Sequence, residues 1–221
     1  MRKFLLLLFV PLMLWSQLPP LQVGMELADP PFETVDENGE PSGLSVDLAY
    51  ALGDYLHREV EIKDTPFLHL IDSLKSNRID CIISSMAVTP ERKKSIAFST
   101  PYMRVGVCML ISSKSDLQDI SQANQKGKVI IVKKTSTSEV WAKRHLKKAK
   151  VVAMDTVSAC ITEVVQGKAD AFLYDQSTVY RAHKEYPEQT KVNLKPFATG
   201  EWAIGINKNN KELLEQVNKF L

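Results

Sequence analysis

The sequence has few of the residues that build metal sites or disulfide frameworks. It contains three cysteines and four histidines in 221 residues. Cys81, Cys108 and Cys160 form no C-x-x-C pair and have no clustered histidine beside them, so no metal site is expected. Three thiols cannot all pair, and each lies in apolar or helix-like sequence. We expect buried free thiols, with a Cys81–Cys108 disulfide as the alternative in an exported chain.

An excess of one charge is also missing. Lysine and arginine number 28 and aspartate and glutamate 26, which leaves a net charge of +2. One dense basic run, 143–150, follows Val140 and Trp141 and has the spacing of an amphipathic helix with a solvated basic face. No aromatic residues alternate with these basic ones, so no nucleic-acid partner is expected.

Catalytic signatures are absent as well. There is no G-x-S-x-G, no phosphate-binding loop and no paired-carboxylate motif, and the four histidines are scattered along the chain. We therefore expect neither an enzyme nor a cofactor.

Only one long apolar run is present, at residues 4–15, after Arg2 and Lys3. Its charged start, its length and the polar and proline residues that end it predict a secretory signal peptide over 1–17. Cleavage is expected near Ser16 or Gln17. The site has no A-x-A pattern, so an uncleaved membrane tether is the alternative.

Strand and helix patterns alternate after this signal, which is typical of βα sheets with right-handed crossovers. Strands are expected at 21–27, 60–62, 79–83, 105–111, 129–132, 151–153, 169–173 and 202–206. Helices are expected at 43–56, 67–74, 156–165 and 176–182, after Thr89 and Ser136, from 210 onward, and as a short piece within 116–127.

The segment 79–103 carries the strongest binding signal. An apolar run is followed by Ser84 and Ser85, and then Thr89 has the place of a helix N-cap with Pro90 in the first turn. Arg92 follows in that turn, and its planar guanidinium can hold a carboxylate through two parallel hydrogen bonds. The pattern predicts a carboxylate site, with a solvated first-turn arginine as the alternative.

A second predicted helix start is also suited to binding an anion. Ser136 and Glu139 have the spacing of a capping box, so the backbone N–H groups of Thr137 and Ser138 are expected to point out of the helix. Such a helix N-terminus accepts anions.

Three stretches resemble the type-2 periplasmic solute-binding proteins of polar amino-acid ABC importers: TPERKKSIAFSTPY (89–102), PPFETVDENGEPSGLSVDLAYAL (30–52) and GKADAFLYD (167–175). The resemblance extends over 21–221. It implies an α/β fold of two lobes, each a βα sheet, joined by a hinge of two crossovers. Lobe 1 would comprise 21–102 plus 203–221, lobe 2 would comprise 107–197, and the crossovers would lie near 103–106 and 198–202.

The resemblance also assigns ligand roles. Arg92 would hold the α-carboxylate of an amino acid, together with the backbone N–H groups of Ala87 and Thr137. Asp175 would take the α-ammonium, helped by the carbonyl or hydroxyl of Ser85. An N-cap role for Asp175 is the alternative, and it is compatible with ammonium binding.

Side-chain specificity would come from a second group of residues. The resemblance places an aromatic wall at Phe67, an acid at Glu26 and a base at Lys133. Asp29 stands where an aromatic residue is common, and Thr135 replaces the usual glycine of a turn. An acid and a base at one pocket favour glutamine, whereas Asp29 favours arginine, and we prefer a glutamine-like ligand slightly.

The function implied is an exported, monomeric binding protein of the periplasm that closes around a free polar amino acid. It would deliver this amino acid to the membrane subunits of an ABC permease. The alternative is an exported enzyme of the same fold, of the dehydratase or cell-wall lytic type, acting on a small carboxylate.

Overall fold

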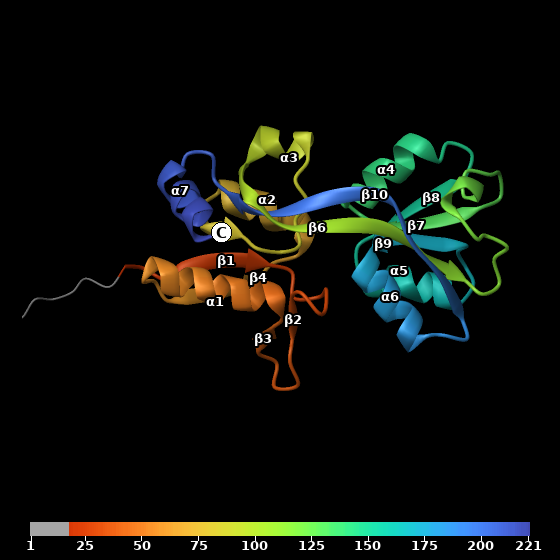
Figure 1. The fold of residues 1–221 in the computed structure, drawn as a ribbon, viewed down its shortest axis with the longest axis horizontal. Helices are drawn as coiled ribbons and strands as arrows, with labels where there is room; N and C mark the ends of the chain where they lie inside the picture. The colour runs from red at the N-terminus through yellow and green to blue at the C-terminus, as the bar shows by residue number, and fades with distance from the viewer. Residues whose placement is uncertain (1–17) are drawn as a thin grey trace, which may run out of the picture.

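The computed structural model describes residues 18–221, in which two lobes lie side by side and are bridged by two long strands (Figure 1). The predicted signal peptide, 1–17, lies outside the described residues. None of the helices described is long and apolar enough to cross a membrane.

Lobe 1 is built on three parallel strands in the order β4-β1-β5, and helices pack on them. Leu21 and Val23 on the central strand pack with Ile204 and Val217 in one core. Its elements are β1 (Leu21–Met25), β2 (Thr34–Val35), β3 (Pro41–Ser42), α1 (Leu44–Leu56), β4 (Val60–Asp64), α2 (Phe67–Lys75), β5 (Cys81–Ile82), α3 (Pro90–Ser95) and α7 (Lys211–Phe220).

Lobe 2 continues the same sheet with the order β9-β7-β8, again with parallel neighbours. Phe172 and Cys160 belong to one of its two cores, and Leu173 and Ile130 belong to the other. The helix expected within 116–127 is reduced to one 3₁₀ turn. The elements are η1 (Ile120–Gln122), β7 (Val129–Lys133), α4 (Thr137–His145), β8 (Lys150–Met154), α5 (Val157–Val165), β9 (Ala171–Asp175) and α6 (Gln176–Glu185).

The two bridging strands are β6 (Ala97–Ser112) and β10 (Thr190–Ile206). They pair antiparallel along most of their length, with register shifts. Both are much longer than the strands expected from the sequence, because each supplies the hydrogen-bond ladder of the other. The crossovers expected near 103–106 and 198–202 therefore lie inside continuous strands. We keep 21–102 with 203–221, and 107–197, as the proposed bounds of the lobes.

The cysteines are free and buried. Cys81 lies in the core of lobe 1, whereas Cys108 and Cys160 lie in a core of lobe 2. The alternative of a Cys81–Cys108 disulfide is therefore wrong, because the two thiols belong to separate cores. Burial raises the pKa of Cys108 to about 11 and that of Cys160 to about 12, which makes both thiols unreactive.

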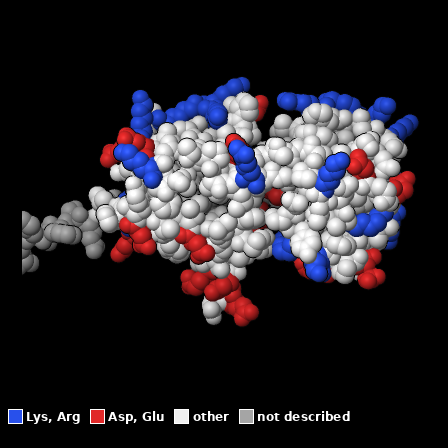
Figure 2. Space-filling view, in the orientation of Figure 1, with Lys and Arg blue, Asp and Glu red and all other residues white. Residues whose placement is uncertain are grey.

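Charges are distributed unevenly over the surface. Figure 2 shows lysine and arginine gathered along the edge of the molecule that carries α3 and α4, and aspartate and glutamate gathered on the β2–β3 hairpin. Lys143 and Arg144 of the predicted basic helix are exposed on α4. This helix accordingly has the solvated basic face expected from its sequence.

Candidate functional site

A cavity lies where the carboxyl ends of strands from both lobes face each other. Ligands of open α/β sheets bind at such edges. The cavity brings together all nine residues that the sequence singled out: Glu26, Asp29, Phe67, Ser85, Ala87, Arg92, Lys133, Thr137 and Asp175. It is also lined by Ser84 and by Ser136 and Ser138 of the predicted anion-accepting helix start, and by three residues that the sequence did not single out: Glu33, Tyr174 and Trp202.

Arg92 lies in the first turn of α3 as expected, with its backbone N–H donating to the Thr89 hydroxyl at 3.1 Å. Its Nη1 donates to the Ala87 carbonyl at 2.6 Å, and its Nη2 donates to the Thr135 carbonyl of lobe 2 at 2.8 Å. Burial lowers its pKa to about 10, so the guanidinium stays positive at neutral pH. The side chain is thus held rigidly at the cavity and already links the two lobes.

Backbone donors accompany this arginine. The Ser136 hydroxyl accepts the N–H of Glu139 at 3.1 Å, as a capping residue does. The Glu139 carboxylate accepts the N–H of Thr135 at 2.6 Å in place of the Ser136 N–H that a capping box would use. Within residues 18–221 the N–H groups of Thr137 and Ala87 donate to no protein acceptor. Backbone donors suited to an anion are therefore left free on both sides of the cleft.

Asp175 ends β9 and has the backbone conformation of an N-cap for α6, but its side chain makes no capping hydrogen bond. Burial, with a smaller effect from neighbouring Asp29, raises its pKa to about 7. Helix capping therefore does not account for this carboxylate. It lines the cavity as an acceptor suited to an ammonium group.

Glu33 is a cavity residue that sequence reasoning missed. It is 2% exposed, and its Oε2 accepts from the Ser45 hydroxyl at 2.5 Å and from the Ser85 hydroxyl at 3.1 Å. Burial raises its pKa to about 8. Its one local signal is its place directly after Pro31 and Phe32, since its partners are 12 and 52 residues away.

Asp29 joins the lobes from the same loop. Its Oδ1 accepts from the Thr178 hydroxyl on α6 at 3.0 Å, and Arg181 of the same helix donates to the Pro30 carbonyl at 3.2 Å. Burial raises the pKa of Asp29 to about 6. The carboxylate that stands at a common aromatic position thus contacts lobe 2 directly.

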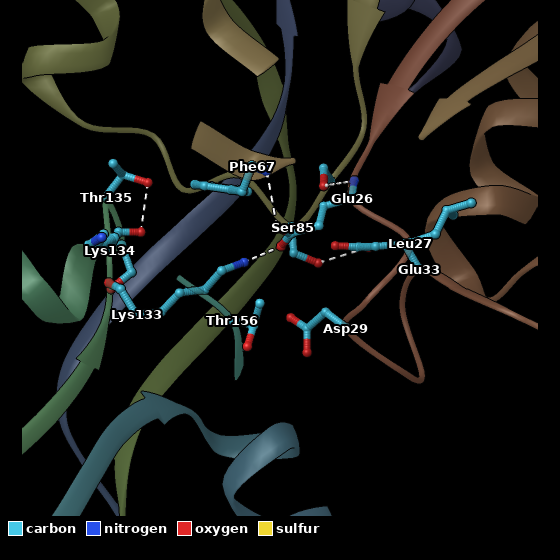
Figure 3. Close-up of polar contacts among 12 residues, drawn as sticks. Glu26, Leu27, Asp29, Glu33, Phe67, Ser85, Lys133, Lys134, Thr135 and Thr156 are labelled. Atoms are coloured by element: carbon cyan, nitrogen blue, oxygen red, sulfur yellow. Dashed lines mark hydrogen bonds and ion pairs between the residues drawn. The ribbon is translucent and has the colours of Figure 1, made fainter. Parts of the chain in front are cut away.

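Glu26 and Lys133 pair with each other across the cleft (Figure 3). Glu26 Oε1 accepts from the backbone N–H of Phe67 at 3.1 Å, and its Oε2 accepts from the Lys133 ammonium. The Lys133 Nζ lies 4.9 Å from the centroid of the Phe67 ring, a cation–π distance. The sequence had predicted two separate contacts to a ligand side chain, whereas the structure forms an ion pair.

Two residues other than glycine adopt left-handed backbone on opposite sides of the cleft. They are Ser85 with φ 48° and Thr135 with φ 61°. A β-branched threonine is strongly disfavoured in this conformation, and such strain gathers at binding sites. Thr135, which replaces the glycine expected in this turn, therefore keeps the left-handed turn geometry at an energetic cost.

These features define a class of protein. Lobe 1 supplies an arginine and lobe 2 supplies a carboxylate that has no hydrogen-bond partner among residues 18–221, and both line one cavity. Such an arrangement is typical of two-lobed proteins that bind a small zwitterion. Among residues 18–221 no group of three or more His, Cys, Asp and Glu side chains is arranged to hold a metal ion.

Comparison with known proteins gives the family. Residues 21–221 match the model of the bacterial extracellular solute-binding proteins, family 3, and the chain belongs to this family. ABC transporter arginine-binding protein 1 of Escherichia coli is 30% identical over 206 residues, which are 91% of this chain and 83% of that protein.

Solved structures agree with the fold. The arginine-bound form of truncated ArgBP from T. maritima is 34% identical, with a TM-score of 0.84 over 90% of this chain and 93% of that one. An ancestral arginine-binding protein bound to glutamine is also 34% identical, with a TM-score of 0.84 over 91% and 87%.

Proposed function

We propose that this chain captures a free polar amino acid and delivers it to the membrane subunits of an ABC permease. One observation carries the proposal: Arg92 of lobe 1 and Asp175 of lobe 2 line the same cavity. An amino acid needs both, because buried charges are costly unless each meets an opposite charge.

In this proposal the α-carboxylate lies between Arg92 and the N–H groups of Ala87 and Thr137. The α-ammonium meets Asp175, and the carbonyl of Ser85 assists. The Ser85 hydroxyl already donates to Glu33 at 3.1 Å, so it is less available to the ligand than its carbonyl.

A ligand with a neutral side chain fits the charges at the side-chain end of the cavity. Glu26 and Lys133 already pair with each other, so neither needs a charged group on the ligand as its partner. Arginine stays the alternative, since Asp29 is 3% exposed and offers a carboxylate beside the cavity. A preference for glutamine accordingly remains part of the proposal.

The protein would work by closing its lobes around the ligand. We place it in the periplasm as a monomer without cofactor, after export directed by 1–17. A permease would then recognise the closed form, in which the two lobes present one continuous surface.

A thermal-shift screen with the twenty amino acids tests this function. A ligand at about 100 times its Kd stabilises the folded state by roughly 2.7 kcal/mol, which raises Tm by several degrees. We expect one or a few polar amino acids to do so. No shift with any of them would contradict the proposal.

Arg92→Ala supplies the site-specific test. Loss of a buried two-point carboxylate contact is expected to cost about 3 kcal/mol, more than a hundredfold in affinity. Arg144→Ala is the control, because Arg144 is exposed on α4. Ligand released from the parent protein is expected to be chemically unchanged by mass spectrometry, and a converted product would indicate an enzyme instead.

A further inference from the structure

The basic run at 143–150 has no part in the ligand cavity. Its residues belong to a larger group of exposed basic side chains on α3, on α4 and in the turn that follows α4. Lys208 joins this group because its Nζ donates to the carbonyl of Lys94 at 2.7 Å. We call the group the basic edge; its six members are Lys93, Lys94 and Lys208 of lobe 1 and Arg144, Lys147 and Lys148 of lobe 2.

The protein does not neutralise these charges itself. Within residues 18–221 no member of the basic edge forms an ion pair with a carboxylate. The neighbouring Lys143, by contrast, lies 2.6 Å from Glu139. Glu91 in the first turn of α3 is exposed, and it leaves a clear excess of positive charge. The charges of the basic edge are therefore available to an anionic partner.

Both halves of the basic edge lie on one side of the molecule. α3 and α4 border the same groove, which Glu91 lines from lobe 1 and Val140 and Arg144 line from lobe 2. Figure 2 shows lysine and arginine side chains gathered along this side, and the acidic β2–β3 hairpin on the opposite side. An anionic surface therefore attracts the basic edge and repels the hairpin, which gives the molecule one preferred orientation.

We propose that the basic edge is a docking surface for a bilayer that contains anionic phospholipids. Its charges come from five lysines and one arginine, and a lysine ammonium is a compact charge on a flexible stem. Such side chains adapt to a fluid array of phosphate groups, whereas the planar fork of arginine is better suited to a shaped acidic site on a protein. Val140 between the two halves is 50% exposed and adds an apolar side chain that can enter the headgroup layer.

The attraction is strong enough to measure. Each lysine or arginine close to an anionic bilayer strengthens binding roughly fivefold, and salt screens the effect beyond about 10 Å. Docking through this edge would also bring the groove between α3 and α4 to the bilayer. Ala87 and Thr137 line both that groove and the ligand cavity, so the cavity would lie near the membrane that holds the proposed permease.

Co-sedimentation of the full chain with vesicles tests the proposal. Vesicles of phosphatidylglycerol and phosphatidylcholine in equal parts are compared with vesicles of phosphatidylcholine alone. We expect binding to the anionic vesicles in low salt, weaker binding at about 0.5 M salt, and weaker binding to phosphatidylcholine alone. Equal binding to both kinds of vesicle would overturn the proposal. Residues 1–17 are the same in every variant, so only differences between variants are assigned to the basic edge.

Two double variants locate the binding surface. Lys93→Gln/Lys94→Gln removes two charges from lobe 1, and Lys147→Gln/Lys148→Gln removes two from lobe 2. Each is expected to weaken binding to the anionic vesicles at least about fivefold in low salt. Weaker binding in only one of them would overturn a surface shared by both lobes. Lys94→Gln or Lys148→Gln alone replaces a double variant that near-UV circular dichroism shows to be unfolded.

Lys168→Gln/Lys184→Gln is the matched control. It removes the same charge, but Lys168 follows α5 and Lys184 lies on α6, and both helices are on the side of lobe 2 away from α4 (Figure 1). This variant is expected to bind the anionic vesicles as the parent does. An equal loss in the control would reflect net charge alone and would overturn the role of the basic edge.

An acidic protein is the other partner that the same experiment can reveal. Poly-glutamate serves as its probe. If the parent binds poly-glutamate through the basic edge but does not bind the anionic vesicles, the partner is an acidic protein and the lipid proposal is wrong. Binding to neither probe overturns the docking surface altogether. Amino-acid binding is measured separately, so each of these failures leaves the proposed function standing.

Discussion

A substitution at Asp175 tests the proposed binding of the ligand ammonium directly. Asp175→Asn keeps the size of the side chain but removes the charge that we assign to the ligand ammonium. We expect affinity to fall at least about tenfold in calorimetry, because a buried ammonium would lose its charged partner.

The fold should be unaffected, since Asp175 makes no capping hydrogen bond to α6. Asp155→Asn is a suitable control because the Asp155 side chain is 74% exposed. If Asp175→Asn binds as tightly as the parent, the ammonium must be held by another group.

Glu33 predicts a pH dependence of stability in the ligand-free protein. Burial raises its pKa from 4.5 to about 8, so folding favours the protonated acid. Its stabilising contribution is therefore complete below pH 4.5 and is lost as the pH rises through about 8. The loss should be on the order of a few kcal/mol in the free energy of unfolding.

Urea unfolding at several pH values measures this effect. Asp29 and Asp175 also have raised pKa values and titrate in an overlapping range, so the informative quantity is the difference between the parent and Glu33→Gln. The variant should lose part of the decline with pH. Parallel curves for the two proteins would show that Glu33 does not titrate in this range.

At single residues, the sequence predicted the contacts between residues that are close together in the chain and missed those between distant residues. Thr89, Arg92 and Ser136 were predicted where the structure has them, because a helix cap depends on neighbours three residues away. The engagement of Glu33 by serines and the pairing of Glu26 with Lys133 were not predicted. These contacts depend on the fold, which brings together residues up to 107 positions apart.

Among the elements, β6 and β10 depart most from the sequence prediction. Pro101 and Gly106 both weaken the strand pattern of 97–112, yet the ladder with β10 spans both positions. Helices α1, α2, α5 and α7 were predicted within a few residues, because the spacing of their apolar residues is a local signal.

Gly106 and Gly200 lie in the two crossover segments, and replacing each by alanine is predicted to change the stability by different amounts. A Cβ at Gly106 would lie 2.6 Å from Cγ and 2.8 Å from Cβ of Pro196, a rigid ring that cannot move aside cheaply. A Cβ at Gly200 would meet nothing closer than 3.7 Å. Gly106→Ala should cost about 1–3 kcal/mol in unfolding free energy, whereas Gly200→Ala should change it by less than about 0.5 kcal/mol.

Chemical denaturation of both variants checks this, and each serves as the control for the other. Neither glycine has a positive φ, so the difference in stability between the two variants should come only from the space available to the added Cβ atom. Equal losses in the two variants would point to a requirement for backbone freedom in the hinge as a whole.

At the scale of the molecule, the structure is a closed clamp. Hydrogen bonds and ion pairs cross between the lobes at Arg92–Thr135, Glu26–Lys133, Asp29–Thr178 and Pro30–Arg181. In the proposed mode of binding the ligand needs this closed form, since Arg92 of lobe 1 and Asp175 of lobe 2 would each meet one of its two charges. Ligand should therefore shift an equilibrium between open and closed forms toward the closed one.

Small-angle X-ray scattering tests the shift. The radius of gyration should be smaller at saturating ligand than without ligand. An unchanged radius, with binding verified by calorimetry in the same buffer, would mean that the lobes do not move apart when the site is empty.

The return of β10 and α7 to lobe 1 has a consequence for how the chain folds as it is made. Leu21 and Val23 of the first strand share a core with Leu213 and Val217 near the end of the chain. The cores of lobe 2 draw only on residues within 108–197. A growing chain can thus complete lobe 2 first, while its first strand has no finished core until synthesis is almost over. Pulse-labelled hydrogen exchange during refolding should therefore protect β7 and β9 before β1.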